Sequence, residues 1–218
     1  MKRRAKTLVK GIMGGVCNSI GGWLYLRARV DLGSIVVASF LFTTGSVFIA
    51  HWFFYLFTGK IGFLLEKDDE KRRSKAIDLG IGLLGNLLGC MMMGFLIRTA
   101  AYDTNVNLFH ELHGIVNMKI GHDWYEALIL SFFCGLLIHI GTDGMRRIDN
   151  PLGRYLVLFL CIGGFTLAGF EHSVANMFFY FLNNTYTWEA ALSLLILVFG
   201  NALGGIAVSG VRLLVSKE

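Results

Sequence analysis

Residues 169–180 read GFEHSVANMFFY and place two ionisable side chains, Glu171 and His172, next to each other inside a long apolar stretch. A charged group at the centre of a bilayer costs about 3 kcal/mol on insertion scales, so such a pair needs compensation from its surroundings. The remaining sequence shows what kind of surroundings these are.

The composition is that of an integral membrane protein. Of the 218 residues, 55% are hydrophobic and only 16% are charged, and the mean hydropathy is +0.60. A spanning helix needs about 20 mostly apolar residues, and the long apolar runs do not alternate as barrel strands do, so they predict an all-α membrane protein. Six segments qualify as transmembrane helices: 8–26, 33–58, 76–97, 124–143, 154–182 and 190–214.

The basic residues predict the orientation in the membrane. Most of the 20 Lys and Arg residues lie near the N-terminus, in 67–75, in 146–154 and near the C-terminus. With six spans these regions share one side, which the positive-inside rule makes the cytoplasm. We therefore expect a multi-pass protein of the cell (inner) membrane with both termini cytoplasmic, and no nucleic-acid partner. The start resembles a signal peptide, but Arg27 and Arg29 stand where a cleavage site would be, so a retained first span is expected.

A short internal repeat divides the chain. GNLLG at 85–89 and GNALG at 200–204 lie 115 residues apart, and an offset of 114 carries Thr58 onto His172. Three spans per half make the second half inverted, within a single transmembrane channel domain of halves 1–105 and 106–218. The second and fifth segments are expected to be broken at FTG and AGFEHS, with Gly59 and Gly169 as breakers, because irregular backbone is tolerated in membranes where it lines a cavity.

The Glu-His pair has a structural and a functional interpretation. In the first, Glu171 is a buried acceptor and His172 a neutral packing residue. In the second, which we favour for His172, the imidazole faces a pore with Thr58 opposite and exchanges a proton with an anion that then crosses as a neutral acid. For Glu171 we favour the structural role of holding the break and the orientation of the histidine.

Other polar residues can be interpreted in two ways. Lys119 and Lys60 are either interfacial lysines or residues that concentrate anions, on the outer and inner side respectively. His110 and His113 fit a solvated amphipathic segment better than a metal site, so neither a metal nor a cofactor is expected. Four cysteines read as small buried hydrophobes: Cys17, Cys90, Cys134 and Cys161.

Four stretches together resemble one family. GFEHSVANM is similar to the signature of the formate/nitrite transporter family, and LFTG at 56–59 resembles its second-span break. KIGHDWYEA at 119–127 resembles the stretch that carries the vestibule lysine of the family, and the two GNxxG motifs fall where it has similar glycine-rich motifs. Two residues depart from the family pattern. Lys60 follows LFTG where the family usually has Asn, and Gly135 stands where a pore Asn is common.

The resemblance implies an aquaporin-like helical fold and a homopentamer with one pore per protomer. It makes His172 the central pore histidine, Thr58 its partner and Lys119 the anion-attracting vestibule residue. Leu56 or Phe57, together with Phe165, would form the apolar constrictions. The candidate pore set is completed by Glu171, Asn176 and Lys60.

These observations predict a membrane channel or transporter for a small monovalent weak-acid anion, with formate as the first candidate and nitrite, hydrosulfide or lactate as related cargo. A membrane-embedded enzyme using Glu171 and His172 is a weaker alternative, because the sequence has no nucleophile motif, metal constellation or cofactor box. A purely structural membrane protein would leave the buried pair unexplained. The expected partners are the anion, the lipid bilayer and further copies of the chain.

Overall fold

All regular structure in the described residues is helical. The computed structural model describes residues 2–66 and 71–215. Its elements are α1 (Arg3–Asp31), α2 (Ile35–His51), α3 (Phe57–Lys60), the 3-10 helix η1 (Ile61–Leu65), α4 (Arg72–Ala101), α5 (Val106–Ile120), α6 (Trp124–Arg147), α7 (Pro151–Leu167), α8 (Ser173–Leu182) and α9 (Trp188–Val215). The predicted all-α class is confirmed.

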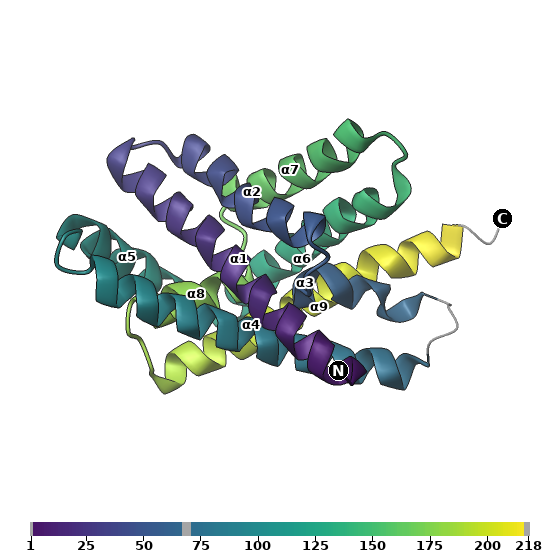
Figure 1. Ribbon diagram of the computed structural model, residues 1–218. Coiled ribbons are helices and arrows are strands. Elements are labelled where there is room, and N and C mark those ends of the chain that lie inside the picture. Colours follow the sequence, from purple (N-terminus) through teal and green to yellow (C-terminus); the bar gives the residue numbers. More distant parts are fainter. Residues whose placement is uncertain (1, 67–70, 216–218) are drawn as a thin grey trace.

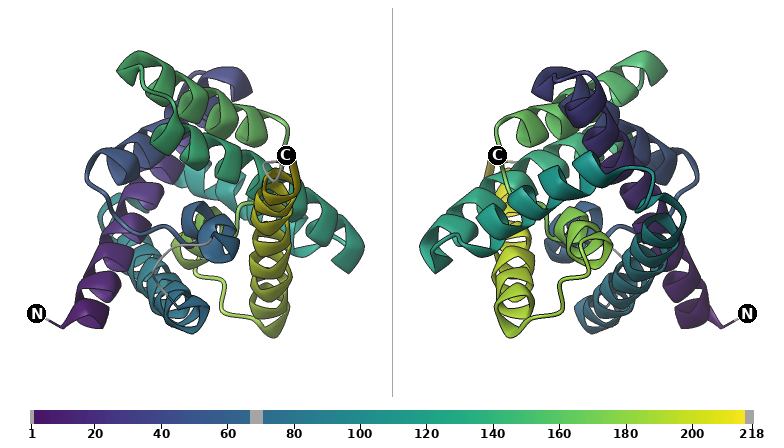
Figure 2. Two further views of the ribbon diagram at one scale, coloured as in Figure 1. Left: turned by 90° about the vertical axis from the view of Figure 1, so that its right-hand side faces the viewer. Right: turned by 90° about the vertical axis from the view of Figure 1, so that its left-hand side faces the viewer.

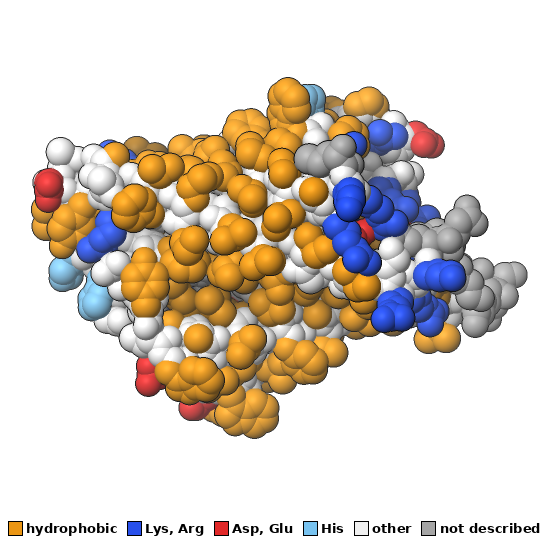
Figure 3. Space-filling view, turned by 60° about the horizontal axis from the view of Figure 1, so that its bottom comes forward, with side chains coloured by type: hydrophobic (Ala, Val, Ile, Leu, Met, Phe, Trp, Pro, Cys, Tyr) orange, Lys and Arg blue, Asp and Glu red, His pale blue; other side chains and the backbone are white. Residues whose placement is uncertain are grey.

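Three helices within these ranges are individually long and apolar enough to cross a membrane, namely α4, α6 and α9. The apolar helices α2 and α7 have 17 residues each, about 25 Å at 1.5 Å per residue, somewhat less than the hydrocarbon thickness of ~30 Å. The count of six spans therefore stays a prediction. Apolar side chains cover a broad face of the molecule, and Lys and Arg gather at one end (Figure 3), which we call the basic end.

The long helices pack as pairs around the two shortest α-helices. The pairs α1–α4 and α6–α9 lie in close contact, α2 packs on α7, and α3 and α8 lie between the longer helices (Figures 1 and 2). Glycines allow the close approach: a Cβ on Gly89 would meet the backbone of α1 at Ile12, and one on Gly204 would meet α6 at Phe132. Close small-residue contacts of this kind are typical of helix pairs in membranes.

The chain leaves helical geometry after α2 and again after α7. The first irregular segment comprises residues 52–56, where Phe53 has a φ of 55°. The second comprises residues 168–172, where Gly169 has a φ of 74°, a conformation that favours glycine. The first interruption therefore precedes the predicted FTG. Gly59 lies inside α3, so its assignment as a breaker is wrong.

Two buried asparagines hold the points where the chain re-enters a helix. Asn86 Oδ1 accepts the N–H of Phe57, at the start of α3, at 2.9 Å, and its Nδ2 donates to Gly11 O at 2.8 Å and to Tyr55 O at 2.7 Å. The amide thus satisfies a free N–H at a helix start and a carbonyl of the irregular segment, which lipid could not do.

Asn201 makes the equivalent set of bonds in the second half. Its Oδ1 accepts the N–H of Ser173, at the start of α8, at 2.9 Å, and its Nδ2 donates to Ser131 O at 2.8 Å and to Glu171 O at 2.9 Å. Both asparagines belong to the GNxxG repeats and are fully buried. This equivalence supports an internal repeat, and the halves 1–105 and 106–218 remain a prediction.

Candidate functional site

His172 and Thr58 meet at the centre of the molecule. His172 immediately precedes α8, and Thr58 lies in α3, so each is positioned by one of the helices that the asparagines hold. The Nε2 atom of the imidazole lies 2.9 Å from Thr58 Oγ1, and both residues are buried, at 4% and 0% exposure. The structure brings together the two residues that the sequence offset of 114 had paired.

Two phenylalanines flank the imidazole. Phe165, from α7, lies with its ring centroid 5.7 Å from that of His172, and Phe42, from α2, lies edge-on at 6.4 Å. Phe42 was not among the predicted site residues, because an apolar residue in an apolar helix gives no signal in the sequence. Among the described residues, His172 Nδ1 has no hydrogen-bond partner. The ring therefore has one nitrogen available to a solute.

A cavity of about 150 Å³ reaches His172 from the side of α5, and we call it the α5-side cavity. His172, Glu171, Asn176, Phe165 and Lys119 are among the residues that line it. Five of the predicted pore residues thus share one hollow, in which carboxylate, amide, ammonium and imidazole groups lie against aromatic rings.

Glu171 organises the polar side of this cavity. Lys119 Nζ donates to both carboxylate oxygens at 2.7 Å, and Asn176 Nδ2 donates to Oε2 at 2.6 Å. The Glu171 side chain is 2% exposed and that of Lys119 14%. The charge of Lys119 is therefore shared with a carboxylate, and the ammonium group does not project alone into the cavity. Glu171 ties α5 to α8 through its side chain.

His122 is a third ionisable residue near Glu171, and its contact with Glu171 was not predicted from the sequence. Located in the turn between α5 and α6, it places Nε2 3.6 Å from Glu171 Oε1 and Nδ1 3.5 Å from Glu126. Interaction with the Glu171 carboxylate raises the pKa of His122 above its ordinary value, although burial and Lys119 oppose this. Only the proximity of His122 to Lys119 in the sequence could have suggested this.

A second cavity of about 140 Å³, the throat, approaches from the basic end. Leu56, Gly59 and Lys60 line it, with Leu56 two residues from Thr58. Phe57 lines neither this cavity nor the α5-side cavity, because it packs with Ile61 and Leu79 in a separate core cluster. Of the two predicted alternatives for the inner constriction, Leu56 is the one that borders a cavity.

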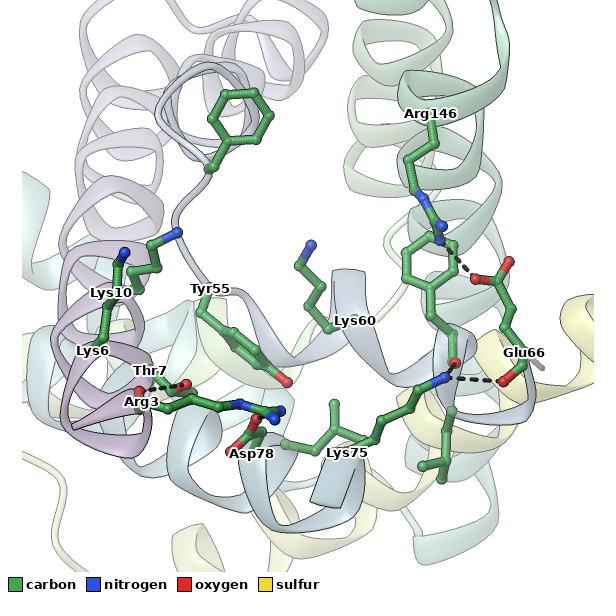
Figure 4. A pocket seen from close by; sticks show the side chains of 14 residues that line it. Arg3, Lys6, Thr7, Lys10, Tyr55, Lys60, Glu66, Lys75, Asp78 and Arg146 are labelled. Atoms are coloured by element: carbon green, nitrogen blue, oxygen red, sulfur yellow. Dashed lines mark hydrogen bonds and ion pairs between the residues drawn. The ribbon is translucent and has the colours of Figure 1, made fainter. Parts of the chain in front are cut away.

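The throat opens into a wider cavity of about 520 Å³, the basic vestibule (Figure 4). The two share the lining residues Phe53, Lys60, Phe63 and Arg146. The Lys60 side chain projects into the vestibule (Figure 4). The sequence left open whether Lys60 is an interfacial lysine or a residue that concentrates anions, and this position fits the second interpretation.

The other residues singled out in the sequence belong to the packing. A Cβ on Gly135 would meet the backbone of Asn201, so this glycine permits the close approach of α6 and α9. The four cysteines are unpaired, three of them buried and Cys161 half-buried. Residues 2–66 and 71–215 contain no group of three or more His, Cys, Asp or Glu residues that could hold a metal.

The site can therefore offer a small solute two approaches to one hydrogen-bonding pair. The α5-side cavity ends at His172 and the throat ends at Leu56. Between them lie the Thr58–His172 bond and the apolar side chains of Leu56, Phe42 and Phe165, all at most 6% exposed. A charged solute is disfavoured in such a constriction, whereas a small neutral one is tolerated.

Comparison with known proteins identifies related sequences. The profile of the Formate/nitrite transporter family matches residues 1–215. The formate-nitrite transporter of Plasmodium knowlesi is 28% identical over 91% of this chain and 68% of that protein. The formate channel FocA of Haemophilus influenzae is 23% identical over 81% of this chain and 66% of that protein.

Solved structures share the fold. A pentameric formate channel with formate bound superimposes with a TM-score of 0.86 at 19% identity, covering 100% of this chain and 99% of that chain. An ion channel described as a member of the FNT family superimposes with a TM-score of 0.79 at 20% identity, covering 98% and 89% of the two chains.

Proposed function

The chain belongs to the formate/nitrite transporter family, and on that premise we propose that it passes formate or a closely related small monovalent weak-acid anion across the membrane. The observation that carries the proposal is the buried Thr58–His172 hydrogen bond, which separates two cavities that approach from opposite ends. The cavities on either side are only 140–150 Å³, well below the ~300–1,000 Å³ typical of pockets for larger ligands.

The proposed mechanism uses a proton held transiently by His172. An anion entering the constriction loses water and meets the apolar surfaces of Leu56, Phe42 and Phe165, which do not compensate its charge. It therefore favours transfer of a proton from water on the entry side to the imidazole beside it. Transfer of that proton to the anion leaves a neutral imidazole and a neutral acid, which crosses the constriction and releases the proton to water on the far side.

Thr58 would position the histidine in this mechanism. Its hydroxyl occupies Nε2 at 2.9 Å, so the solute would meet the ring at Nδ1. Lys119 and Lys60 would attract the anion on the two sides of the constriction. The charge of Lys119 is shared with Glu171. Nitrite and hydrosulfide are alternative cargoes, since both are small, monovalent and protonatable.

The alternative of a membrane-embedded enzyme is excluded by the family, whose members are transporters and channels. In keeping with this, the Glu171 carboxylate is occupied by Lys119 and Asn176. We further propose that the chain assembles as a homopentamer with one pore per protomer; one of the solved structures that share its fold is a pentameric formate channel. The basic end, with both termini, would face the cytoplasm.

Flux into proteoliposomes tests the function. Formate, nitrite, hydrosulfide, lactate and, as a neutral control, glycerol are each measured between about pH 5 and pH 8, around the titration range of histidine. We expect flux of formate but not of glycerol, and a loss of about tenfold or more, or a changed pH dependence, in the His172→Phe variant.

His139→Phe is a useful control, because this buried histidine bonds Ser209 away from the constriction. It should keep the pH profile of the unmodified chain even if it lowers stability. Equal formate flux in the unmodified chain and in His172→Phe at every pH would refute the proposed role of the histidine, and flux of none of the anions would refute the proposed function.

A further inference from the structure

The basic vestibule contains an excess of positive charge. It is lined by the basic residues Arg3, Lys6, Lys10, Lys60, Lys75 and Arg146 and by the acidic residues Glu66 and Asp78. Tyr55, Phe53 and Phe63 contribute aromatic surface. Like charges that converge on a hollow with low-dielectric walls focus their field into it.

The two carboxylates are already engaged. Asp78 pairs with Arg3. Glu66 accepts from Arg146 at 2.8 Å and from Arg212 at 2.6 Å, and a third guanidinium, that of Arg147, lies 3.1 Å away. Arg212 and Arg146 hold the pKa of Glu66 below its usual range, against the effect of burial, so that this carboxylate is ionised and saturated with donors.

Three lysines remain without a carboxylate partner in the part of the chain that the structure describes: Lys6, Lys10 and Lys60. Lys6 and Lys10 lie one turn apart on α1 and form one wall of the vestibule, whereas Lys60 rises from α3 opposite them (Figure 4). Arg146 approaches from the other side and stacks on Phe63, with its guanidinium carbon 4.2 Å from the ring centroid.

A monovalent anion would leave most of this charge uncompensated. Three ammonium groups offer up to nine N–H donors, and charge-assisted bonds to phosphate oxygens are among the strongest that lysine makes. The volume of about 520 Å³ lies in the range of ~300–1,000 Å³ typical of small-molecule pockets. The vestibule therefore fits an anion with several clustered phosphate groups, such as the polyphosphate of a nucleotide.

We propose that the basic vestibule binds an anion carrying clustered phosphate groups and that the bound anion closes the throat. Closure follows from position, because the throat and the vestibule share Lys60 and Arg146. A ligand held by these side chains lies over the opening toward Leu56. Binding stands independently, whereas closure rests on the proposed function.

Calorimetric titration of the purified chain with inorganic tripolyphosphate tests binding directly. We expect one site per chain, an affinity that falls with added salt, and a loss of about tenfold in each of Lys60→Gln and Lys10→Gln, the size expected for a charge-assisted bond. The matched control is Arg73→Gln, which removes the same charge from an exposed position on α4 outside the vestibule. It should retain the affinity.

Folding of each variant is checked by its thermal unfolding temperature. Lys60→Arg provides a second test, because it keeps the positive charge and should therefore keep the affinity for tripolyphosphate. Absence of binding to the folded, unmodified chain would overturn the proposal. So would an equal loss of affinity in Arg73→Gln and Lys60→Gln, because the attraction would then be nonspecific.

Two sources of the phosphates are distinguished by repeating the titration in nanodiscs. In discs of phosphatidylcholine the full affinity is expected. If discs containing phosphatidylinositol bisphosphate suppress tripolyphosphate binding, the occupant is a lipid headgroup, and if they do not, it is a soluble polyphosphate; either result supports the site.

Closure is measured as formate flux with saturating tripolyphosphate on the side of the basic end. We expect inhibition in the unmodified chain and in Arg73→Gln, and about tenfold higher concentrations for half-inhibition in Lys60→Gln. Undiminished flux would overturn closure. Absence of any anion flux would instead refute the proposed function, while the calorimetry would still decide whether the site exists.

Discussion

Among single residues, Glu171 determines how much positive charge the α5-side cavity presents to an anion. Its carboxylate is within 2.7 Å of Lys119 Nζ and 3.6 Å of His122 Nε2. With His122 neutral, Lys119 and Glu171 compensate each other. With His122 protonated, the group has a surplus of one positive charge. His122 does not itself line the α5-side cavity, but its protonation changes the net charge of the group that it forms with Lys119 and Glu171, which do line it.

His122 should make uptake from this side depend on pH. Its pKa is raised by Glu171, so the interaction with Glu171 is fully present at acid pH and is lost as the pH rises through the raised pKa. The surplus charge thus appears as the pH falls. We expect His122→Gln to reduce formate uptake several-fold at acid pH and to leave uptake at alkaline pH unchanged.

The ratio of uptake in the variant to uptake in the unmodified chain, measured at each pH, separates this effect from protonation of formate itself. His110→Gln is the matched control, because His110 is exposed on α5 and, unlike His122, makes no ion pair with Glu171 among the described residues. A constant ratio for His122→Gln across the pH range would show that His122 does not set the charge of the cavity. The facing groups, Glu126 at 3.5 Å and Lys119, are unchanged in both variants.

Among the secondary-structure elements, the short helices α3 and α8 depend on side chains of longer helices. A helix of four residues, such as α3, has too few internal hydrogen bonds to be stable alone. Asn86 and Asn201 supply the missing partners at the starts of α3 and α8. The positions of Thr58 and His172 are therefore fixed by α4 and α9.

Replacing either asparagine should release the corresponding short helix. Asn86→Ala and Asn201→Ala each remove three bonds and leave a buried N–H at a helix start and a carbonyl of the irregular segment unsatisfied, at about 1–3 kcal/mol per group. We expect a lower thermal unfolding temperature of the solubilised protein for both, and a loss of formate flux. Asn107→Ala, at an exposed position on α5, should change neither. Unfolding temperatures equal to that of the unmodified chain would contradict the assigned role.

Glycines on α9 offer a test of helix packing within one element. A Cβ at Gly204 would collide with the backbone of Phe132, whereas one at Gly210 meets nothing within 4 Å. Gly204→Ala should therefore destabilise the protein by about 1–3 kcal/mol, and Gly210→Ala should be neutral or stabilise it by up to ~1 kcal/mol. The comparison is made by thermal unfolding in detergent, and equal effects would exclude the close α6–α9 contact.

In the whole molecule, charge and apolar surface are separated. Lys and Arg gather at the basic end, and a broad apolar face covers the region between the ends (Figure 3). Large side chains such as Phe95, Leu195 and Phe199 are more than half exposed. Surface of this kind must be covered by lipid or by further copies of the chain.

The proposed pentamer predicts the mass of the solubilised assembly. Native mass spectrometry in a mild detergent should give a protein mass five times the 24.2 kDa of the chain, because each protomer would bury part of its apolar surface against two neighbours. A monomer as the sole species under conditions in which formate flux is retained after reconstitution would contradict the pentamer.

The sequence by itself determined the class of the fold and the importance of the adjacent residues Glu171 and His172. Apolar runs report membrane helices because hydropathy is a local property. Two adjacent ionisable residues in such a run, at 171 and 172, mark a site because their placement is unfavourable without partners. The nine-residue stretch that contains them was sufficient to suggest the family, which the match over residues 1–215 shows.

Only the tertiary structure decided which side chains meet. The bonds of Asn86 to Gly11, of Lys119 to Glu171 and of Asn201 to Ser131 join residues separated by 75, 52 and 70 positions. The first interruption was predicted too late, at Gly59, because helix re-entry there is stabilised by Asn86 on another helix and not by a local breaker. Such contacts depend on how helices are packed, and a local pattern of residues does not contain that information.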